Sequence, residues 1–350
     1  MTLRYNTAVQ PIKTEFPGNL PFRSIGQFYR AKFGSRVQTL PVTIASDCPN
    51  RRGLRGMKTC VFCDVWGSSA YPSQRELGLK EQIEDRIRKL GPRYGSQQFL
   101  VYFQAYTNTF VAVQKLRESF EMALSFPQVK GFIVGTRPDC LSKATLDLWE
   151  EYSKRAYVSV ELGVQTFDEE QLLFLRRGHT GTQSVEAIHR IAETGIDLGV
   201  HLIFGIPGET KRQMEDTANL ISELPVHSVK LHNLHVLTNT PLAEMYAEGK
   251  FEPASLETYS DRVIEFLEAL DPSVWVQRLA ALSSRWDELV APEWNRHKMK
   301  TYNFIVNRMR EKQSYQGKLR DIKSLLPRAA DSRCLGYASF PSLLSQPAPL

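Results

Sequence analysis

The feature that most constrains the fold is a regular alternation of short apolar runs with helical segments along the middle of the chain. The runs are almost continuously apolar, which is typical of parallel strands whose two faces are both covered by helices. Six such β/α units over roughly 200 residues predict a full or partial barrel rather than an open two-half sheet. No Gly-x-Gly-x-x-Gly segment follows the first run, which disfavours a dinucleotide-binding fold. The expected strands are 37–44, 98–104, 129–135, 156–163, 197–204 and 227–234.

Helical periodicity fills the intervals between these runs and continues beyond them. Pro41 lies inside the first run and argues for an edge strand or an interruption, because proline cannot donate to a sheet ladder. A further strand is expected over 274–279. The expected helices are 24–34 (closed by Gly34), 79–90, 109–125, 143–154, 182–193, 211–223, 255–271 and 294–311.

The domain organisation expected from these elements is one α/β core with an extension at each end. The last segment is basic and then rich in Ser, Pro and Ala, a composition that favours disorder. The expected parts are an N-terminal extension (1–35), a barrel (36–250), a C-terminal helical extension that packs on the barrel (251–312) and a disordered tail (313–350).

The composition is that of a globular protein, with 42% hydrophobic and 23% charged residues among 350. No run is long and apolar enough to cross a bilayer, and the N-terminus lacks the apolar core of a secretory signal, so we expect a cytoplasmic protein without membrane contact. The net charge of +6 permits a nucleic-acid partner but does not require one.

Three of the five cysteines, Cys48, Cys60 and Cys63, lie close together just after the first expected strand. In a reducing compartment, clustered thiols are more often metal ligands than disulfides. Nearby arginines and lysines are expected to favour thiolates. Structural zinc usually has four ligands and this loop has no histidine, whereas an iron–sulfur cluster can keep three protein ligands. The cysteines therefore favour a cluster, and a zinc site completed by a distant histidine stays open.

The segment from Ala45 to Cys63 resembles the cysteine motif of the radical SAM superfamily in an expanded spacing, with the expected aromatic Phe62 before the last cysteine. Further blocks follow in order along residues 28–310, and the set is most similar to the YhcC-type family, which is related to the elongator-acetyltransferase-like and anaerobic coproporphyrinogen oxidase branches. The resemblance implies a partial (β/α)6 barrel of the TIM type with a C-terminal helical extension.

The same resemblance implies two cofactors, a [4Fe–4S] cluster on Cys48, Cys60 and Cys63 and S-adenosylmethionine on the iron that lacks a cysteine. The expected enzyme is a transferase or oxidoreductase that begins by reductive cleavage of S-adenosylmethionine to a 5′-deoxyadenosyl radical. It implies an electron donor of the flavodoxin or ferredoxin type, and tRNA or another RNA is a candidate substrate. The rival hypothesis is a zinc-stabilised RNA-binding module without catalysis.

Several residues are carried over as S-adenosylmethionine contacts on the basis of this resemblance. Gln104 or the backbone near Tyr106 replaces the family's Gly-Gly-Glu segment, and Glu161 with Gln165 is suited to hold the ribose hydroxyls. Arg177 resembles the arginine that pairs with the methionine carboxylate, with Arg176 as its competitor. The expected contacts are Phe62, Gln104, Tyr106, Glu161, Gln165, Arg177, Gly205 and Ile206.

On the substrate side, the resemblance points to Arg137, His232 and His235, although Arg137 can equally pair with Asp139. His232 and His235 are three residues apart, which in a strand would place them on opposite faces. After Arg278 the chain departs from the Thr-Gly-Asp segment common in the family, so the substrate itself is not predicted.

Overall fold

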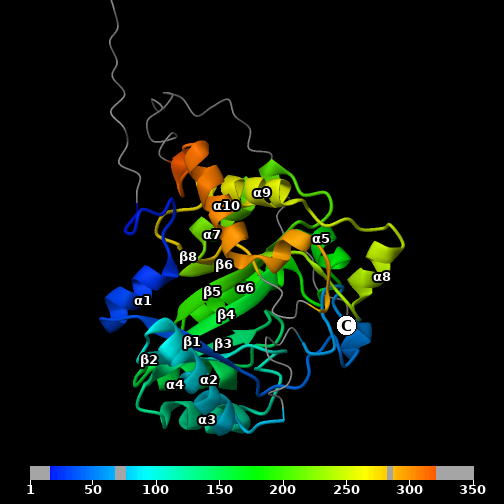
Figure 1. Ribbon diagram of the computed structural model, residues 1–350. Helices are drawn as coiled ribbons and strands as arrows, with labels where there is room; N and C mark the ends of the chain where they lie inside the picture. Colours follow the sequence, from blue (N-terminus) through cyan, green and yellow to red (C-terminus); the bar gives the residue numbers. More distant parts are fainter. Residues whose placement is uncertain (1–15, 68–75, 282–286, 321–350) are drawn as a thin grey trace, which may run out of the picture.

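The fold is organised around a seven-stranded sheet that curls into a half-barrel (Figure 1). The structure is a computed structural model, and it describes residues 16–67, 76–281 and 287–320. All neighbouring strands of this sheet are parallel. The predicted partial barrel is therefore confirmed. In sheet order the strands are β1 (Val37–Val42), β2 (Gln98–Phe103), β3 (Val129–Thr136), β4 (Tyr157–Gln165), β5 (Asp197–Phe204), β6 (Ser228–Asn233) and β8 (Trp275–Arg278).

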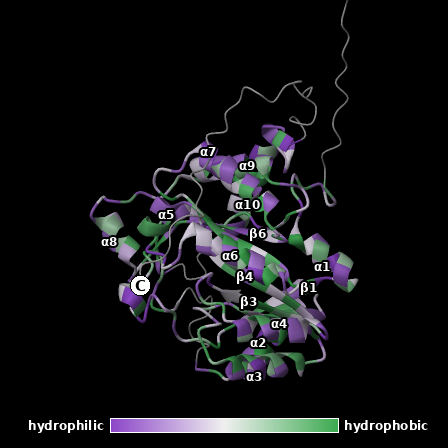
Figure 2. Ribbon diagram, turned by 180° about the vertical axis from the view of Figure 1, so that it is seen from behind, coloured by the Kyte–Doolittle hydropathy of each residue, from purple (hydrophilic) through white to green (hydrophobic). Residues whose placement is uncertain are grey.

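The helices cover the outside of the curled sheet, as the apolar strand runs require. Figure 2 shows the strands largely in the hydrophobic colour, whereas the helices carry both colours. The helices are α1 (Ile25–Phe33), α2 (Leu79–Tyr94), α3 (Val113–Leu124), α4 (Lys143–Ser153), α5 (Glu169–Phe174), α6 (Gly181–Ala192), α7 (Lys211–Glu223), α8 (Pro241–Ala247), α9 (Leu256–Ala269) and α10 (Lys298–Glu311).

Capping residues explain where three of the helices begin. The side chains of Ser142, Thr180 and Thr210 accept backbone N–H groups from the first turns of α4, α6 and α7. Each cap satisfies a donor that would otherwise lack a partner at the helix start. The loops at this edge of the sheet are thereby kept short and ordered, which is where barrel proteins carry their chemistry.

The core lies between the sheet and its helices and is rich in aromatic rings. Phe120 of α3 stacks on Phe132 of β3 with ring centroids 4.0 Å apart, and Tyr152 of α4 meets both rings edge-on. On the opposite side, Phe204 of β5 packs against Phe266 of α9 with centroids 5.3 Å apart. These contacts fix the strands whose C-terminal ends form the site.

The two edges of the sheet are β1 and β8. The edge position of β1 confirms the expectation from Pro41. The strand β8 lies beyond residue 250, so the C-terminal segment contributes to the barrel sheet as well as packing on it. Residues 24 and 276 form an isolated parallel bridge that brings the N-terminal segment against β8.

Some elements differ from the expectation. The helix expected over 294–311 begins only at Lys298, because a short 3₁₀ turn, Glu293–Arg296, precedes it. The short helices α5 and α8 were not predicted. A small antiparallel ribbon of β7 (Val236–Leu237) and β9 (Leu289–Ala291) was also not predicted.

The predicted tail needs a correction at its start. Residues 313–320 pack against the domain, and Gln316 is 1% exposed. The tail from 321 onward and the first fifteen residues of the predicted N-terminal extension lie outside the described residues. Within the described ranges, no helix has the length and apolar character needed to span a bilayer.

Candidate active site

The three clustered cysteines lie in the loop that follows β1, at the C-terminal edge of the parallel strands. Cys48 and Cys60 are buried and Cys63 is partly exposed. The backbone N–H of Cys63 donates to the carbonyl of Cys60 at 3.0 Å, which closes a tight turn between the two thiols. The spacing of two residues therefore places both side chains on one turn, as the sequence indicated.

The short helices α5 and α8 hold this turn on both sides. The N–H of Val61 donates to the carbonyl of Leu175 at 3.2 Å, and the N–H of Leu242 donates to the carbonyl of Val61 at 2.9 Å. Val61, Leu175 and Leu242 are all buried in one apolar cluster, against which Phe62 also packs. The cysteine turn is thus fixed to the barrel by elements that lie far away in the sequence.

A cavity of about 500 Å³ opens beside the cysteines at the ends of the strands. Of the residues predicted from the sequence, only Gly205 and Ile206 lie off its lining within the described part of the chain. Ile206 is instead 3% exposed and buried in the same apolar cluster as Val61. The predicted residues that line the cavity are Cys48, Cys60, Phe62, Cys63, Gln104, Tyr106, Arg137, Glu161, Gln165, Arg177, His232 and His235.

The thiol electrostatics differ from the expectation. Burial raises the pKa of Cys48, and burial together with the neighbouring thiol of Cys60 raises the pKa of Cys63 to about 12. Arg51 acts in the opposite direction on Cys63 but is outweighed. The basic side chains therefore do not by themselves favour thiolates. A bound metal centre would lower the pKa values of Cys48 and Cys63 directly.

The geometry bears on the zinc alternative. Among residues 16–67, 76–281 and 287–320, no three His, Cys, Asp or Glu side chains converge closely enough to hold one metal ion. A structural zinc ion needs four ligands around a single centre. A [4Fe–4S] cluster instead takes each thiolate on a different iron, so its ligands surround a larger group. The donor set of three thiols around a cavity fits the cluster.

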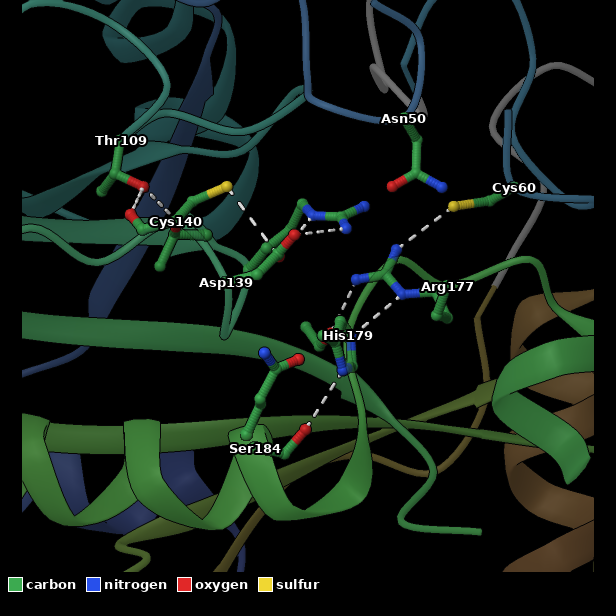
Figure 3. Close-up of polar contacts among 12 residues, drawn as sticks. Asn50, Cys60, Thr109, Asp139, Cys140, Arg177, His179 and Ser184 are labelled. Atoms are coloured by element: carbon green, nitrogen blue, oxygen red, sulfur yellow. Dashed lines mark hydrogen bonds and ion pairs between the residues drawn. The ribbon is translucent and has the colours of Figure 1, made fainter. Parts of the chain in front are cut away.

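Arg177 connects the cysteine turn to the barrel (Figure 3). Its Nη1 donates to the Sγ of Cys60 at 3.4 Å, its Nη2 donates to the carbonyl of Gly163 at 2.8 Å, and its Nε donates to the Nε2 of His179 at 3.2 Å. Arg176, the competing arginine, is exposed, and the cavity lining includes Arg177. The guanidinium is therefore held in one orientation at the edge of the cysteine site.

His179 supplies the acceptor that orients Arg177. Burial and then the charges of Arg177 and Arg137 lower the pKa of His179 to about 3, so the imidazole is neutral. With Nε2 accepting from Arg177, the proton belongs on Nδ1, which lies 3.4 Å from the carbonyl of Thr180 and 3.3 Å from the hydroxyl of Ser184. Figure 3 shows this chain from Cys60 through Arg177 and His179 to Ser184.

Arg137 adopts the pairing that the sequence left open. Its Nε and Nη2 donate to the two carboxylate oxygens of Asp139 at 2.8 and 2.9 Å, and both side chains are largely buried. Such a two-point pair fixes the guanidinium plane. Arg137 still lines the cavity, so it presents a positive charge there while its position is set by Asp139.

Tyr106 closes another part of the edge of the cavity. Its backbone has a φ of +59°, its N–H donates to the carbonyl of Gly67 at 3.1 Å, and its phenol donates to the carbonyl of Val65 at 3.0 Å. The loop after β2 is thereby tied to the segment that follows Cys63. Gln104 precedes it and lines the cavity directly after the end of β2.

Glu161 carries an ion-pair network in the interior of the barrel. One carboxylate oxygen, Oε2, accepts from Lys230 at 2.7 Å, from His201 at 2.5 Å and from the phenol of Tyr102. Although burial acts to raise the pKa of Glu161, Lys230 and His201 hold it below its ordinary range. Glu161 is therefore an anion with one oxygen committed to three protein donors.

His232 and His235 are arranged differently from the expectation. His232 lies in the strand, and β6 ends at Asn233, so strand alternation does not govern His235. Both histidines line the same cavity rather than opposite faces of a strand. Burial lowers the pKa of each, with the charge of Arg278 adding to the effect, to about 4 for His235.

The residues that were missed in the sequence are the polar side chains inside the strands. Tyr102, His201, Lys230 and Arg278 all line the cavity and were not assigned to the site. A signal was available, because Lys230 and His232 are two residues apart in a strand that alternates polar and apolar residues and so share a face. Polar residues at inward positions of buried strands mark a lined cavity rather than a solid core.

A curled half-barrel with three cysteines in the loop after its first strand defines the class of the protein as a radical SAM enzyme. The superfamily model for radical SAM proteins matches residues 44–221, and the Radical_SAM C-terminal domain model matches residues 226–311. The chain is 34% identical to the protein YhcC of Escherichia coli over a stretch of 264 residues. This stretch covers 75% of this chain and 84% of YhcC. The chain belongs to the YhcC-type family of the radical SAM superfamily.

Two more distant likenesses are with a tRNA acetyltransferase and with Elp3. A stretch of 147 residues, 41% of this chain and 26% of the other, is 29% identical to the tRNA uridine(34) acetyltransferase of Methanocaldococcus jannaschii. The solved structure of Elp3 from Methanocaldococcus infernus shares the fold with a TM-score of 0.60 at 17% identity, over 83% of this chain and 68% of that one.

Proposed function

We propose that the protein binds a [4Fe–4S] cluster through Cys48, Cys60 and Cys63 and binds S-adenosylmethionine beside it. The main observation in support of this proposal is that all three thiols line one cavity, together with the polar side chains at successive strand ends. When bound, the cluster supplies the electron that splits S-adenosylmethionine into methionine and a 5′-deoxyadenosyl radical. The chain's own residues position the cofactor and the substrate around that event.

Arg177 is suited to pair with the methionine carboxylate, because its guanidinium is fixed beside Cys60 and stays charged. Gln104 and the loop at Tyr106 offer acceptors to the methionine amine from the rim. Gln165 and the Oε1 of Glu161, to which none of the three interior donors binds, are proposed to hold the ribose hydroxyls. The remaining proposed contacts are Phe62, Gly205 and Ile206, and the proposed substrate-side residues are Arg137, His232 and His235.

The test is anaerobic reconstitution followed by analysis of metal and products. We expect brown protein with about four irons per chain and dithionite-dependent release of 5′-deoxyadenosine. Cys60→Ala should lose that release. Cys140→Ala is the control, because Cys140 is a partly exposed thiol that lies off the cavity lining, and it should keep the activity. Colourless wild-type protein with one zinc ion would instead support the RNA-binding alternative.

We also propose tRNA or another RNA as the substrate class. The supporting observations are the similarity to a tRNA acetyltransferase and the exposed basic side chains of Arg52, Arg55 and Lys58 in the cysteine loop. Phosphate contacts from these side chains predict binding that weakens steeply between about 50 and 200 mM salt. Gel-shift titration of the reconstituted protein with bulk tRNA measures it, and absence of binding at low salt would remove RNA from consideration.

The proposed electron donor is a flavodoxin or ferredoxin type protein, and the proposed compartment is the cytoplasm, where thiols stay reduced. Replacement of dithionite by such a donor should sustain 5′-deoxyadenosine release.

A further inference from the structure

A second cavity, of about 340 Å³, adjoins the first inside the half-barrel. The two cavities share several lining residues, among them Tyr102, Glu161, Lys230 and Arg278. The outer walls of the second cavity come from α1 and α10, which flank the open side between β1 and β8. The junction of the two cavities is therefore deep in the barrel and is reached from the cysteine side as well as from the open edge.

The positive and negative side chains at this junction do not balance. Lys230 pairs with Glu161 at 2.7 Å, which balances one cation with one anion. Arg278 forms no ion pair with any carboxylate in the described ranges; its Nε donates to the carbonyl of Leu231 at 3.3 Å. The Nη2 of Arg278 is buried and has no hydrogen-bond partner among the described residues. One guanidinium charge therefore remains uncompensated.

A second cation adds to this excess. Lys298, the first residue of α10, lines both cavities and has no described carboxylate as an ion-pair partner. Burial lowers the pKa values of His201 and His232, which favours neutral imidazoles that add neither a cation nor an anion. The junction thus presents two cations to a space that can hold a ligand.

An unpaired guanidinium N–H in a buried position is costly, because it has lost water without gaining an acceptor. Arginine stays protonated even when it is buried, so the charge cannot be removed by deprotonation. Its planar fork matches the two oxygens of a carboxylate or phosphate. A ligand that supplies an anion here would remove the cost of this uncompensated charge.

We infer that Arg278, assisted by Lys298, binds an oxyanion of the substrate, a carboxylate or a phosphate, at the junction of the two cavities. This inference rests on the proposed function, because the junction adjoins the cysteine-lined cavity and so places the bound substrate beside the radical source. The oxyanion anchors the substrate from the side opposite the cysteines. The substrate is thereby an acidic compound or a nucleotide unit, rather than a neutral one.

The test uses the reconstituted protein and four probes at constant ionic strength: inorganic phosphate, methyl phosphate, succinate and a short single-stranded RNA. Titration calorimetry should show binding of at least one probe to the wild type. Arg278→Gln should weaken that binding by about tenfold or more, the loss expected for a charge-assisted hydrogen bond. Arg212→Gln is the matched control, because Arg212 is 91% exposed on α7, and it should bind like the wild type.

The pattern of probes identifies the source of the oxyanion. Phosphate and methyl phosphate binding indicates a phosphorylated small molecule, succinate binding indicates a carboxylic acid, and binding of the RNA alone indicates a nucleotide phosphate. Arg278→Lys should keep part of the affinity, since it keeps the charge but loses the fork. Failure of all four probes with the wild type, or equal weakening by Arg278→Gln and Arg212→Gln, would overturn the inference.

Stability provides a readout that separates binding from a structural role. If Arg278 is an unpaired ligand-binding cation, Arg278→Gln should melt at the same or a higher temperature without ligand, and the bound probe should raise the melting temperature of the wild type only. A lower melting temperature with retained binding would count against the inference. Release of 5′-deoxyadenosine, measured in parallel, reports the proposed function separately, because wild-type cleavage without probe binding contradicts the oxyanion site alone.

Discussion

At the scale of single residues, Glu209 is a buried carboxyl group at the loop that follows β5. Its Oε2 accepts from the N–H of Gly205 at 2.7 Å, whereas its Oε1 is buried without a partner among the described residues. Burial raises the pKa of Glu209 to about 7, even though the N–H groups of Gly205 and Ile206 and the charge of Arg262 act to lower it. The folded protein therefore holds this proton more tightly than the unfolded chain does.

This shift predicts a pH dependence of stability. The folded pKa of Glu209 is above its ordinary value of 4.5, so its contribution to stability is fully present below pH 4.5 and is lost as the pH rises through 7. Glu209→Gln keeps an acceptor for Gly205 and does not titrate. It should raise the free energy of unfolding relative to the wild type by roughly 1–3 kcal/mol at pH 8, and by much less at pH 5.

Urea unfolding of the reconstituted protein between pH 5 and 8 measures the difference. Glu150→Gln, at a carboxylate that is 53% exposed on α4, is the matched control and should leave the pH profile unchanged. Other titrating groups, such as the buried histidines, cancel because they are common to each comparison. Parallel pH profiles for Glu209→Gln and the wild type would show that Glu209 is ionised normally.

Residues in a local motif could be predicted, whereas residues that meet only in the folded barrel could not. Cys48, Cys60 and Cys63 form a recognisable spacing, and all three line the cavity. Lys230 and Arg278 lie on different strands, and although His232 places Lys230 on an inward face, no neighbour of Arg278 in the sequence reveals its surroundings. The charge imbalance at Arg278 depends on which carboxylates are absent nearby, and that is a property of the packed interior.

At the scale of elements, the cysteine turn depends on α8, a seven-residue helix. Leu242 is fully buried there, and its N–H holds the carbonyl of Val61 between two of the cysteines. Leu242→Ala should cost about 2–5 kcal/mol in the free energy of unfolding, because it leaves a cavity in this small apolar cluster. The looser turn should also release iron faster to a chelator.

Leu148→Ala is the control for this prediction, since Leu148 of α4 is a similarly buried leucine in the main core. It should lower stability by a similar amount while its iron-release rate under native conditions stays close to that of the wild type. Equal acceleration by both substitutions would mean that iron loss follows global stability and not the α8 contact.

Elements of ordinary length could be predicted because their periodicity extends over several turns. The helix α7, for example, has the bounds 211–223 that the pattern predicts. The helices α5 and α8 were missed because six or seven residues do not show a helical repeat. Their positions are fixed by tertiary contacts with the cysteine turn, which local sequence does not encode.

At the scale of the whole molecule, Gln316 joins the two ends of the described chain. Its Oε1 accepts from the N–H of Arg23 at 2.9 Å, and its Nε2 donates to the carbonyls of Asp271 and Val274 at 2.9 and 2.8 Å. The N–H of Val276 in turn donates to the carbonyl of Arg23 at 2.7 Å. One buried amide therefore holds the N-terminal segment against the edge strand β8.

This arrangement predicts that Gln316→Ala destabilises the protein well beyond a surface change. The substitution leaves one buried carbonyl, one part-buried carbonyl and one part-buried N–H without their partner, and each such loss costs about 1 kcal/mol, so the free energy of unfolding should fall by about 3 kcal/mol. Because β8 carries Arg278 and borders the second cavity, the oxyanion probe should also bind more weakly. Gln114→Ala, at an exposed amide on α3, should change neither quantity. Wild-type stability in Gln316→Ala would show that β8 is held by the sheet alone, and the open edge of the half-barrel would then need no closure from the chain ends.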